Sequence, residues 1–245
     1  MKIALLGDSI TEGIGSKKIN YAKYLQDKIP NATVMNFALT GTTISYGLSK
    51  LDDILEFNPD IVIVFYGNVD AMPRLIENTL YYKILPERYK GLGMLEPRAL
   101  FTRKRIKRFF QRLDSGFRYR LKNTLVKNFG YNQWTKIEEF ENTYSLLLEG
   151  LGLNECKVIA VSTVPMCDKL FPYANIEYQK YNKVIENLSF RYSCEFLNLY
   201  EYLKRYDKKL IFLEDLFHPS DKGYDVIGQL LHEKITKASR EIMDG

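Results

Sequence analysis

The chain has 245 residues, 46% of them hydrophobic, and a formal net charge of +5 at pH 7. This length and composition allow a substantial buried core, as one large domain or as one domain with an insertion. No apolar run approaches the roughly 18 residues of a membrane-spanning helix, so an integral membrane protein is not expected.

The N-terminus does not have the pattern of a signal peptide. Met1-Lys2 leads directly into a short apolar run, and Gly7-Asp8-Ser9 follows where a longer apolar region should continue. The three cysteines have no metal-ligand spacing and are expected to be reduced: Cys156, Cys167 and Cys194. These features predict a cytoplasmic location.

The first part of the chain predicts an alternation of strands and helices. Uninterrupted apolar runs indicate buried strands at residues 3–6 and 61–66, and a further buried strand is predicted at residues 32–37. Helical spacing of apolar residues predicts helices over residues 21–29 and 48–55, each ended by a turn that contains proline.

A basic segment then interrupts this alternation. Residues 71–135 contain 15 Lys plus Arg but only 4 Asp plus Glu, whereas the rest of the chain is acidic. Arg103-Lys104-Arg105 and Lys107-Arg108 alternate with aromatic residues, a composition too apolar for a disordered tail. We expect an inserted, mostly helical subdomain within a single domain of residues 1–245. Because it follows the third strand, it is expected to form a lid or wall beside any site at the carboxyl edge of the sheet.

The strand–helix alternation resumes after the insertion. Strands are predicted at residues 158–161 and 194–199, and helices over 134–151, 176–192 and 221–242. Five strands alternating with helices predict a three-layer α/β/α fold with a five-stranded parallel sheet.

Ser9 is the candidate nucleophile, because it follows the first strand and ligands bind at the carboxyl ends of parallel strands. A serine needs a base, and the chain has only two histidines, His218 and His232. His218 follows Asp215 by three residues in a predicted loop, where a carboxylate can orient the imidazole. His232 falls inside the last helix and is expected to be structural. An alternative role for Ser9 is a helix N-cap, given its spacing to Glu12.

Three blocks together resemble the SGNH (GDSL-type) hydrolase family. They are Gly7-Asp8-Ser9-Ile10, Gly41 in the loop after the second strand, and Asp215-Leu216-Phe217-His218-Pro219. The resemblance extends over residues 2–66 and from about residue 134 to the end. It implies a flavodoxin-like sheet of the SGNH hydrolase fold.

The resemblance also implies roles for individual residues. Ser9 would be the nucleophile, His218 the general base and Asp215 the group that orients it. The backbone N–H groups of Ser9 and Gly41 would belong to the oxyanion hole, although Gly41 could also be a plain turn glycine. Asp8 would have a supporting role, and no metal or cofactor is implied.

The sequence departs from the family pattern after the third strand. The family has Gly-x-Asn-Asp, but this chain has Gly67-Asn68-Val69-Asp70, with the asparagine one position early. In extended backbone a shift of one residue turns a side chain to the opposite side. Either the loop is rearranged so that Asn68 completes the oxyanion hole, or the hole has two donors. Asp70 is expected to cap the following segment or to contact the insertion.

These residues predict a serine esterase that acts through an acyl-Ser9 intermediate. The expected substrate is an O-acetylated sugar or glycan precursor, because residues 70–74 resemble a subgroup found among polysaccharide-biosynthesis proteins. Two other functions stay open at this point: an O-acetyltransferase that moves acetyl to a sugar hydroxyl, and a non-catalytic binding protein on a degenerated hydrolase fold. A phospholipase-type lipid esterase is a further enzymatic alternative.

The basic insertion has several candidate partners. A basic amphipathic helix can bind an anionic glycan or nucleotide-linked sugar, or lie on an anionic membrane surface, which would make the protein peripheral to the membrane. Nucleic acid is disfavoured because no recognised nucleic-acid module accompanies the charge. The alternative is an ordinary solvated helical face.

Overall fold

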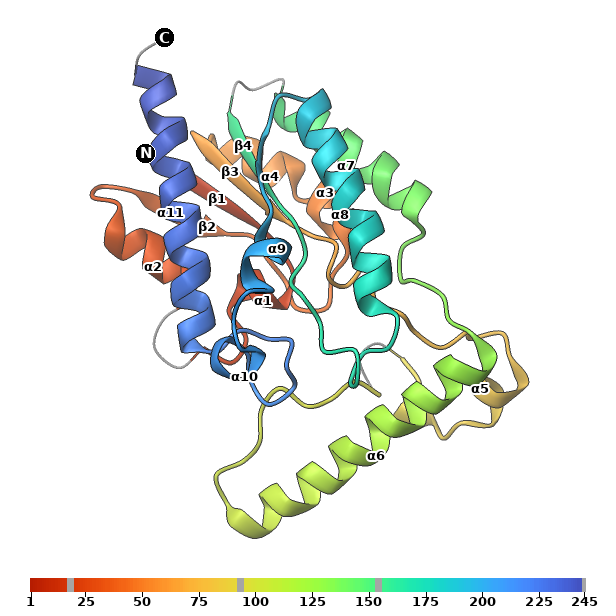
Figure 1. Ribbon diagram of the computed structural model, residues 1–245. Coiled ribbons are helices and arrows are strands. Elements are labelled where there is room, and N and C mark those ends of the chain that lie inside the picture. The colour runs from red at the N-terminus through yellow and green to blue at the C-terminus, as the bar shows by residue number, and fades with distance from the viewer. Residues whose placement is uncertain (17–19, 92–94, 153–155, 244–245) are drawn as a thin grey trace.

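The computed structural model describes residues 1–16, 20–91, 95–152 and 156–243 (Figure 1). Its centre is a sheet of five parallel strands in the order β2-β1-β3-β4-β5. The strands are β1 (Lys2–Gly7), β2 (Thr33–Asn36), β3 (Ile61–Phe65), β4 (Lys157–Val161) and β5 (Glu195–Leu197). The predicted five-stranded parallel sheet is therefore confirmed.

The burial of the strands follows their order in the sheet. The three central strands, β1, β3 and β4, are almost entirely buried, as expected where helices cover both faces. The prediction of a buried second strand is wrong: β2 lies at the edge of the sheet, and Thr33, Met35 and Asn36 are exposed. Edge strands have a neighbour on one side only, so an apolar run there stays partly open to solvent.

Helices form a layer on each side of the sheet. One layer pairs α2 (Tyr21–Lys28) with α11 (Asp221–Met243). The other contains α3 (Ile44–Ser49), α4 (Leu51–Phe57), α7 (Ile137–Gly152) and α8 (Ala174–Arg191). Three short helices border the carboxyl edge: α1 (Ser9–Glu12), α9 (Leu199–Leu203) and α10 (Lys208–Ile211). The single helix expected over residues 48–55 is two helices that meet at Lys50.

The segment between β3 and α7 projects below the carboxyl edge of the sheet in Figure 1. It contains α5 (Leu80–Ile84), the 3-10 helix η1 (Glu87–Tyr89) and the long helix α6 (Arg105–Phe129), joined by irregular turns. It has its own small hydrophobic cluster, separate from the main core, formed by Leu75, Tyr89, Leu95 and Val126. No helix in the described ranges is long and apolar enough to cross a membrane.

Candidate active site

Ser9 lies on a tight turn between β1 and α1. Asp8 is the N-cap of α1, where its Oδ1 accepts a hydrogen bond from the Ile10 N–H at 3.0 Å. Ser9 is therefore the first helical residue, and the alternative in which Ser9 itself is the cap is wrong. Glycine at position 7 is required by crowding, because a Cβ there would lie 2.0 Å from Thr11 Oγ1.

His218 and Asp215 lie in the loop between α10 and α11. Asp215 Oδ1 accepts the backbone N–H groups of Phe217 and His218, each at 3.1 Å. Its Oδ2 lies 2.6 Å from His218 Nδ1. Leu216, between them, has a φ of 54°, a left-handed conformation that is unusual for leucine. The carboxylate thus holds both the backbone of this loop and the imidazole ring.

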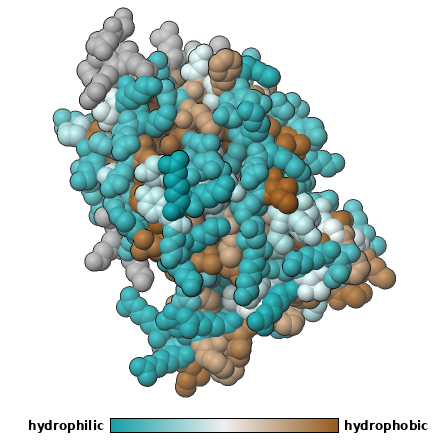
Figure 2. Space-filling model, in the orientation of Figure 1, coloured by the Kyte–Doolittle hydropathy of each residue, from teal (hydrophilic) through white to brown (hydrophobic). Residues whose placement is uncertain are grey.

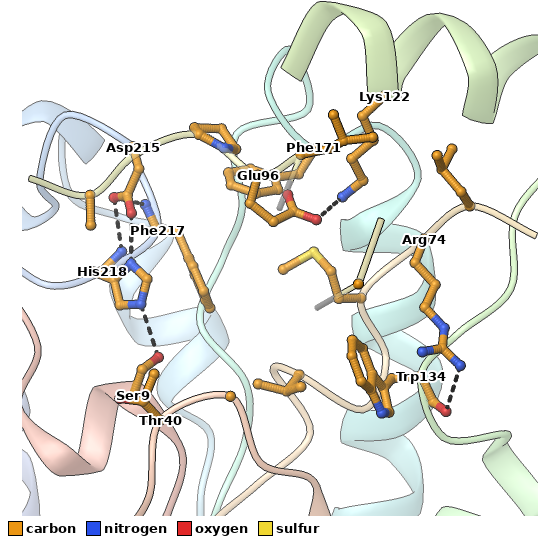
Figure 3. A pocket seen from close by; sticks show the side chains of 18 of the residues that line it. Ser9, Thr40, Arg74, Glu96, Lys122, Trp134, Phe171, Asp215, Phe217 and His218 are labelled. Atoms are coloured by element: carbon orange, nitrogen blue, oxygen red, sulfur yellow. Dashed lines mark hydrogen bonds and ion pairs between the residues drawn. The ribbon is translucent and has the colours of Figure 1, made fainter. Parts of the chain in front are cut away.

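The fold brings Ser9, His218 and Asp215 together from opposite ends of the chain (Figure 3). Ser9 Oγ lies 2.9 Å from His218 Nε2. Ser9 is 4% exposed and Asp215 2%, whereas the His218 ring between them is partly exposed to the cavity. Because the ionised carboxylate accepts the Nδ1–H, the neutral ring has its lone pair on Nε2, where it can receive the serine proton.

The loop after β2 places Gly41 beside Ser9. The Glu12 side chain of α1 accepts the backbone N–H of Thr40 at 2.6 Å and also its hydroxyl, which ties this loop to the nucleophile helix. Gly41 has a φ of 74°, and it borders the same cavity as Ser9. N–H groups in the first turn of a helix have no acceptor within that helix, so the Ser9 N–H points away from α1.

Asn68 does not reach this cavity. Its side chain is fully buried, and its Oδ1 accepts the Val164 N–H at 2.9 Å. Its backbone oxygen accepts the Tyr178 hydroxyl at 2.6 Å. Val69 lines the cavity instead. Neighbouring side chains point to opposite sides here, and an apolar side chain occupies the position where the family pattern has an amide.

Two carboxyl groups next to the site, those of Asp8 and Asp70, are fully buried. Asp70 accepts the N–H groups of Ile44 and Gly67 at 3.0 and 3.1 Å and the Thr135 hydroxyl at 2.8 Å. It therefore caps α3 across the fold and contacts the end of the 71–135 segment, rather than capping the residues that follow it. Burial raises the pKa of Asp70 and that of Asp8 from 3.8 to about 6.

A cavity of about 390 Å³ opens from the Ser9 hydroxyl. More than half of its lining residues belong to the segment 71–135, so the expectation that the insertion forms a wall of the site is confirmed. Most of the lining is apolar, including Met72, Leu75, Leu95 and Phe217. The cavity can therefore take a substrate with a sizeable apolar part next to the ester.

Charged side chains lie in the cavity wall away from His218 (Figure 3). The Lys122 ammonium of α6 pairs with the Glu96 carboxylate, and the lysine side chain is only 4% exposed. The Arg74 guanidinium lies 4.3 Å from the centre of the Trp134 ring. Sequence analysis missed these four residues, because each is an ordinary member of a basic and aromatic segment until the fold brings it to the cavity.

The fold and the site define a class: a parallel α/β/α protein with a hydrogen-bonded serine, histidine and aspartate at the carboxyl edge of its sheet. Residues 5–226 match the GDSL-like Lipase/Acylhydrolase family. The chain belongs to this family and is an SGNH-type ester hydrolase. No curated protein matches the sequence significantly.

Solved structures share the fold at low identity. A lipase/acylhydrolase from Enterococcus faecalis has a TM-score of 0.63 and 17% identity, over 98% of this chain and 96% of that chain. The acetyl xylan esterase AlAXEase has a TM-score of 0.62 and 16% identity, over 96% of this chain and 100% of that chain. A catalytic mutant of the acetylxylan esterase Axe2 from Geobacillus stearothermophilus has a TM-score of 0.59 and 15% identity, over 96% and 93%.

Proposed function

We propose that the protein hydrolyses a carboxylic ester through an acyl-Ser9 intermediate. The observation that carries this proposal is the chain of hydrogen bonds from Ser9 through His218 to Asp215 at the mouth of the cavity. Ser9 Oγ attacks the ester carbonyl carbon while His218 Nε2 takes the hydroxyl proton, and Asp215 stabilises the imidazolium that forms. No cofactor or metal is required for these steps.

The attack first gives a tetrahedral species, which collapses to acyl-Ser9, and water then hydrolyses acyl-Ser9. The tetrahedral oxyanion is stabilised by the backbone N–H groups of Ser9 and Gly41. It collapses with loss of the alcohol, which receives the proton from His218 Nε2. Water, deprotonated by the same nitrogen, then attacks the acyl carbon. As the Ser9 Oγ–acyl bond breaks, His218 Nε2 returns the proton to Ser9 Oγ, and the carboxylic acid leaves. With Val69 in place of an amide, we expect two donors rather than three.

We further propose an O-acetylated sugar or glycan precursor as the substrate. Trp134 offers an aromatic surface in the cavity wall, and Glu96, Lys122 and Arg74 offer polar groups that suit sugar hydroxyls. Two of the solved structures with this fold are called acetyl xylan esterases. Transfer of the acetyl group to a sugar hydroxyl would use the same intermediate with a different second nucleophile.

One observation favours a second candidate substrate, an ester with a longer acyl chain. The cavity wall is mostly apolar, and a small acetyl group would leave much of that surface without a partner. The two candidates differ in which side of the ester is large. An acetylated sugar has a large alcohol, whereas an acyl-chain ester has a large acid.

The experiment compares wild type with Ser9→Ala on p-nitrophenyl esters of increasing chain length and on acetylated xylooligosaccharides. Removal of the nucleophile should lower kcat by about 10⁴-fold or more. Equal rates for wild type and Ser9→Ala would contradict the proposal. A preference for octanoyl over acetyl esters would favour the ester with a longer acyl chain as the substrate. Transfer of the acetyl group to a second sugar, instead of to water, would identify a transferase.

A further inference from the structure

Helix α6 exposes a stripe of large apolar side chains. The stripe consists of Ile106, Phe109, Phe110, Leu113 and Phe117, whose exposed fractions lie between 54% and 77%. Their spacing of three and four residues places them on one face of the helix. Exposed contiguous apolar surface of this kind marks an interaction site more often than an ordinary surface.

The stripe lies opposite the face that packs on the protein. The buried positions of α6 are Ser115, Lys122, Asn123 and Val126, on its other side and flank, over the small cluster and the cavity. The stripe therefore lies outside both hydrophobic clusters, and in the part of the chain that the structure describes only its last residue, Phe117, contacts one of them, through the Tyr89 ring. The residues of the stripe come from the first half of α6, which extends away from the sheet in Figure 1.

Basic side chains surround the beginning of the stripe. Arg103, Lys104, Arg105 and Lys107 are all exposed, and within the described ranges none forms an ion pair with a carboxylate. The acidic residue of α6 is Asp114, which is paired with Arg98 at 2.9 Å. In Figure 2 the lobe that contains α6 shows hydrophobic side chains directly beside long hydrophilic ones.

Two further arginines hold this part of α6 against the body of the protein. Arg108 and Arg112 both pair with Glu214, the residue before Asp215, and the Arg112 Nη2–Oε2 distance is 2.9 Å. Glu214 offsets only one of these two positive charges, so this cluster keeps a net positive charge. The stripe and the four free basic residues therefore face outward from a helix whose position is set by the Glu214 pairs.

We infer that this face of α6 docks on an anionic membrane surface. Phenylalanine, leucine and isoleucine would enter the boundary between headgroups and acyl chains, while the four basic residues contact anionic lipid headgroups. A second copy of the chain is a poorer partner, because two such basic faces repel each other. The inference is independent of the proposed ester hydrolysis, because none of these residues lines the cavity beside Ser9.

The test is co-sedimentation of the full chain with vesicles of phosphatidylcholine, with and without one-third phosphatidylglycerol. Binding to the anionic vesicles should weaken with added salt. Arg103→Glu/Lys104→Glu/Arg105→Glu should lower their affinity by at least about 100-fold. Phe109→Ser/Phe110→Ser/Leu113→Ser should lower it by at least about tenfold.

Matched controls alter the same kinds of residue elsewhere on the surface. Lys23→Glu/Lys28→Glu/Lys136→Glu changes the same amount of charge on exposed lysines away from α6. Leu146→Ser/Ile176→Ser/Phe190→Ser removes three exposed apolar side chains from α7 and α8. Both control variants should bind the anionic vesicles like wild type, and all four should keep the wild-type circular dichroism spectrum and p-nitrophenyl acetate rate.

Several outcomes would overturn the inference. Failure of wild type to co-sediment, or equal loss of binding in the α6 and control variants, would show that this face does not select the membrane. Equal affinity for neutral and anionic vesicles would show that the basic residues do not bind anionic headgroups, which contradicts docking on an anionic surface. A dimer in analytical ultracentrifugation that Phe109→Ser/Phe110→Ser/Leu113→Ser abolishes, without vesicle binding, would assign the stripe to a second copy of the chain.

Discussion

The sheet with its helix layers and the segment 71–135 differ in how far their apolar side chains are buried. In the central strands nearly every apolar side chain is buried, because helices cover both faces. In the segment, a small cluster is buried while the stripe on α6 faces solvent. The difference separates two tasks. Loops at the sheet edge position the groups proposed for the chemistry, whereas the segment shapes the substrate cavity and carries an outward surface.

The largest expected effect comes from the sheet side. Asp215→Asn should lower kcat/KM by about 10⁴-fold, because an amide that donates to Nδ1 would favour the wrong imidazole tautomer. Oδ1 could still accept the two backbone N–H groups, so urea unfolding should change little. A variant that keeps more than a tenth of the wild-type rate on p-nitrophenyl acetate would contradict the proposed role of Asp215.

A gain of function is expected at the position where the family pattern is broken. Val69 lines the cavity, so Val69→Asn would supply a third donor to the oxyanion. One such donor contributes about 10²–10³ in kcat where its geometry is ideal, and we expect a rise of at least tenfold here. Val69→Leu, which adds no donor, is the matched control. Steady-state kinetics on acetyl esters provide the measurement, and a kcat for Val69→Asn no higher than that of Val69→Leu would contradict the prediction.

Asp70 joins the two regions, and its pKa predicts a pH dependence of stability. Its pKa rises from 3.8 to about 6 on folding, because burial disfavours the charge. The raised value means that the contribution of Asp70 to stability is full below pH 3.8 and is lost as pH rises through 6. Between pH 5 and pH 8 the loss amounts to about 1.4 kcal/mol.

Asp70→Asn should remove this contribution, so the difference in unfolding free energy between variant and wild type should shrink over that pH range. Urea titrations of both proteins at the two ends of the range measure it. Asp52→Asn, at an exposed aspartate of α4, is the control for removal of a surface carboxylate. A difference that stays constant with pH would contradict the raised pKa.

The smallest expected effect comes from the segment. Trp134→Ala should raise KM for an acetylated xylooligosaccharide about fivefold, because it removes one aromatic contact. The value of kcat for p-nitrophenyl acetate should stay near wild type, because Trp134 is not one of the reacting groups. Trp134→Phe, which keeps an aromatic ring, should restore most of the affinity. If KM changes only for long-chain acyl esters, the acyl-chain substrate would be favoured over the sugar.

The sequence alone was enough to predict much of this architecture. Strands β1, β3 and β4 each contain a short continuous apolar run, which is typical of strands buried on both faces. The short spacing between Asp215 and His218 allows one loop to hold both. The position of the basic segment after β3 is enough to place it at the carboxyl edge of the sheet, where it forms a wall of the cavity.

Tertiary structure decided the rest, because burial depends on which elements become neighbours. Residues 32–37 predict a buried strand, yet the strand order leaves β2 at an edge. Asn68 and Val69 are adjacent, but the turn after β3 sends the amide into the core and the valine into the cavity. The apolar spacing along α6 indicates an amphipathic helix, but not which face packs. Only the burial of Lys122 and Val126 on the opposite side, Val126 in the small cluster of the segment, shows that its aromatic stripe is turned toward solvent.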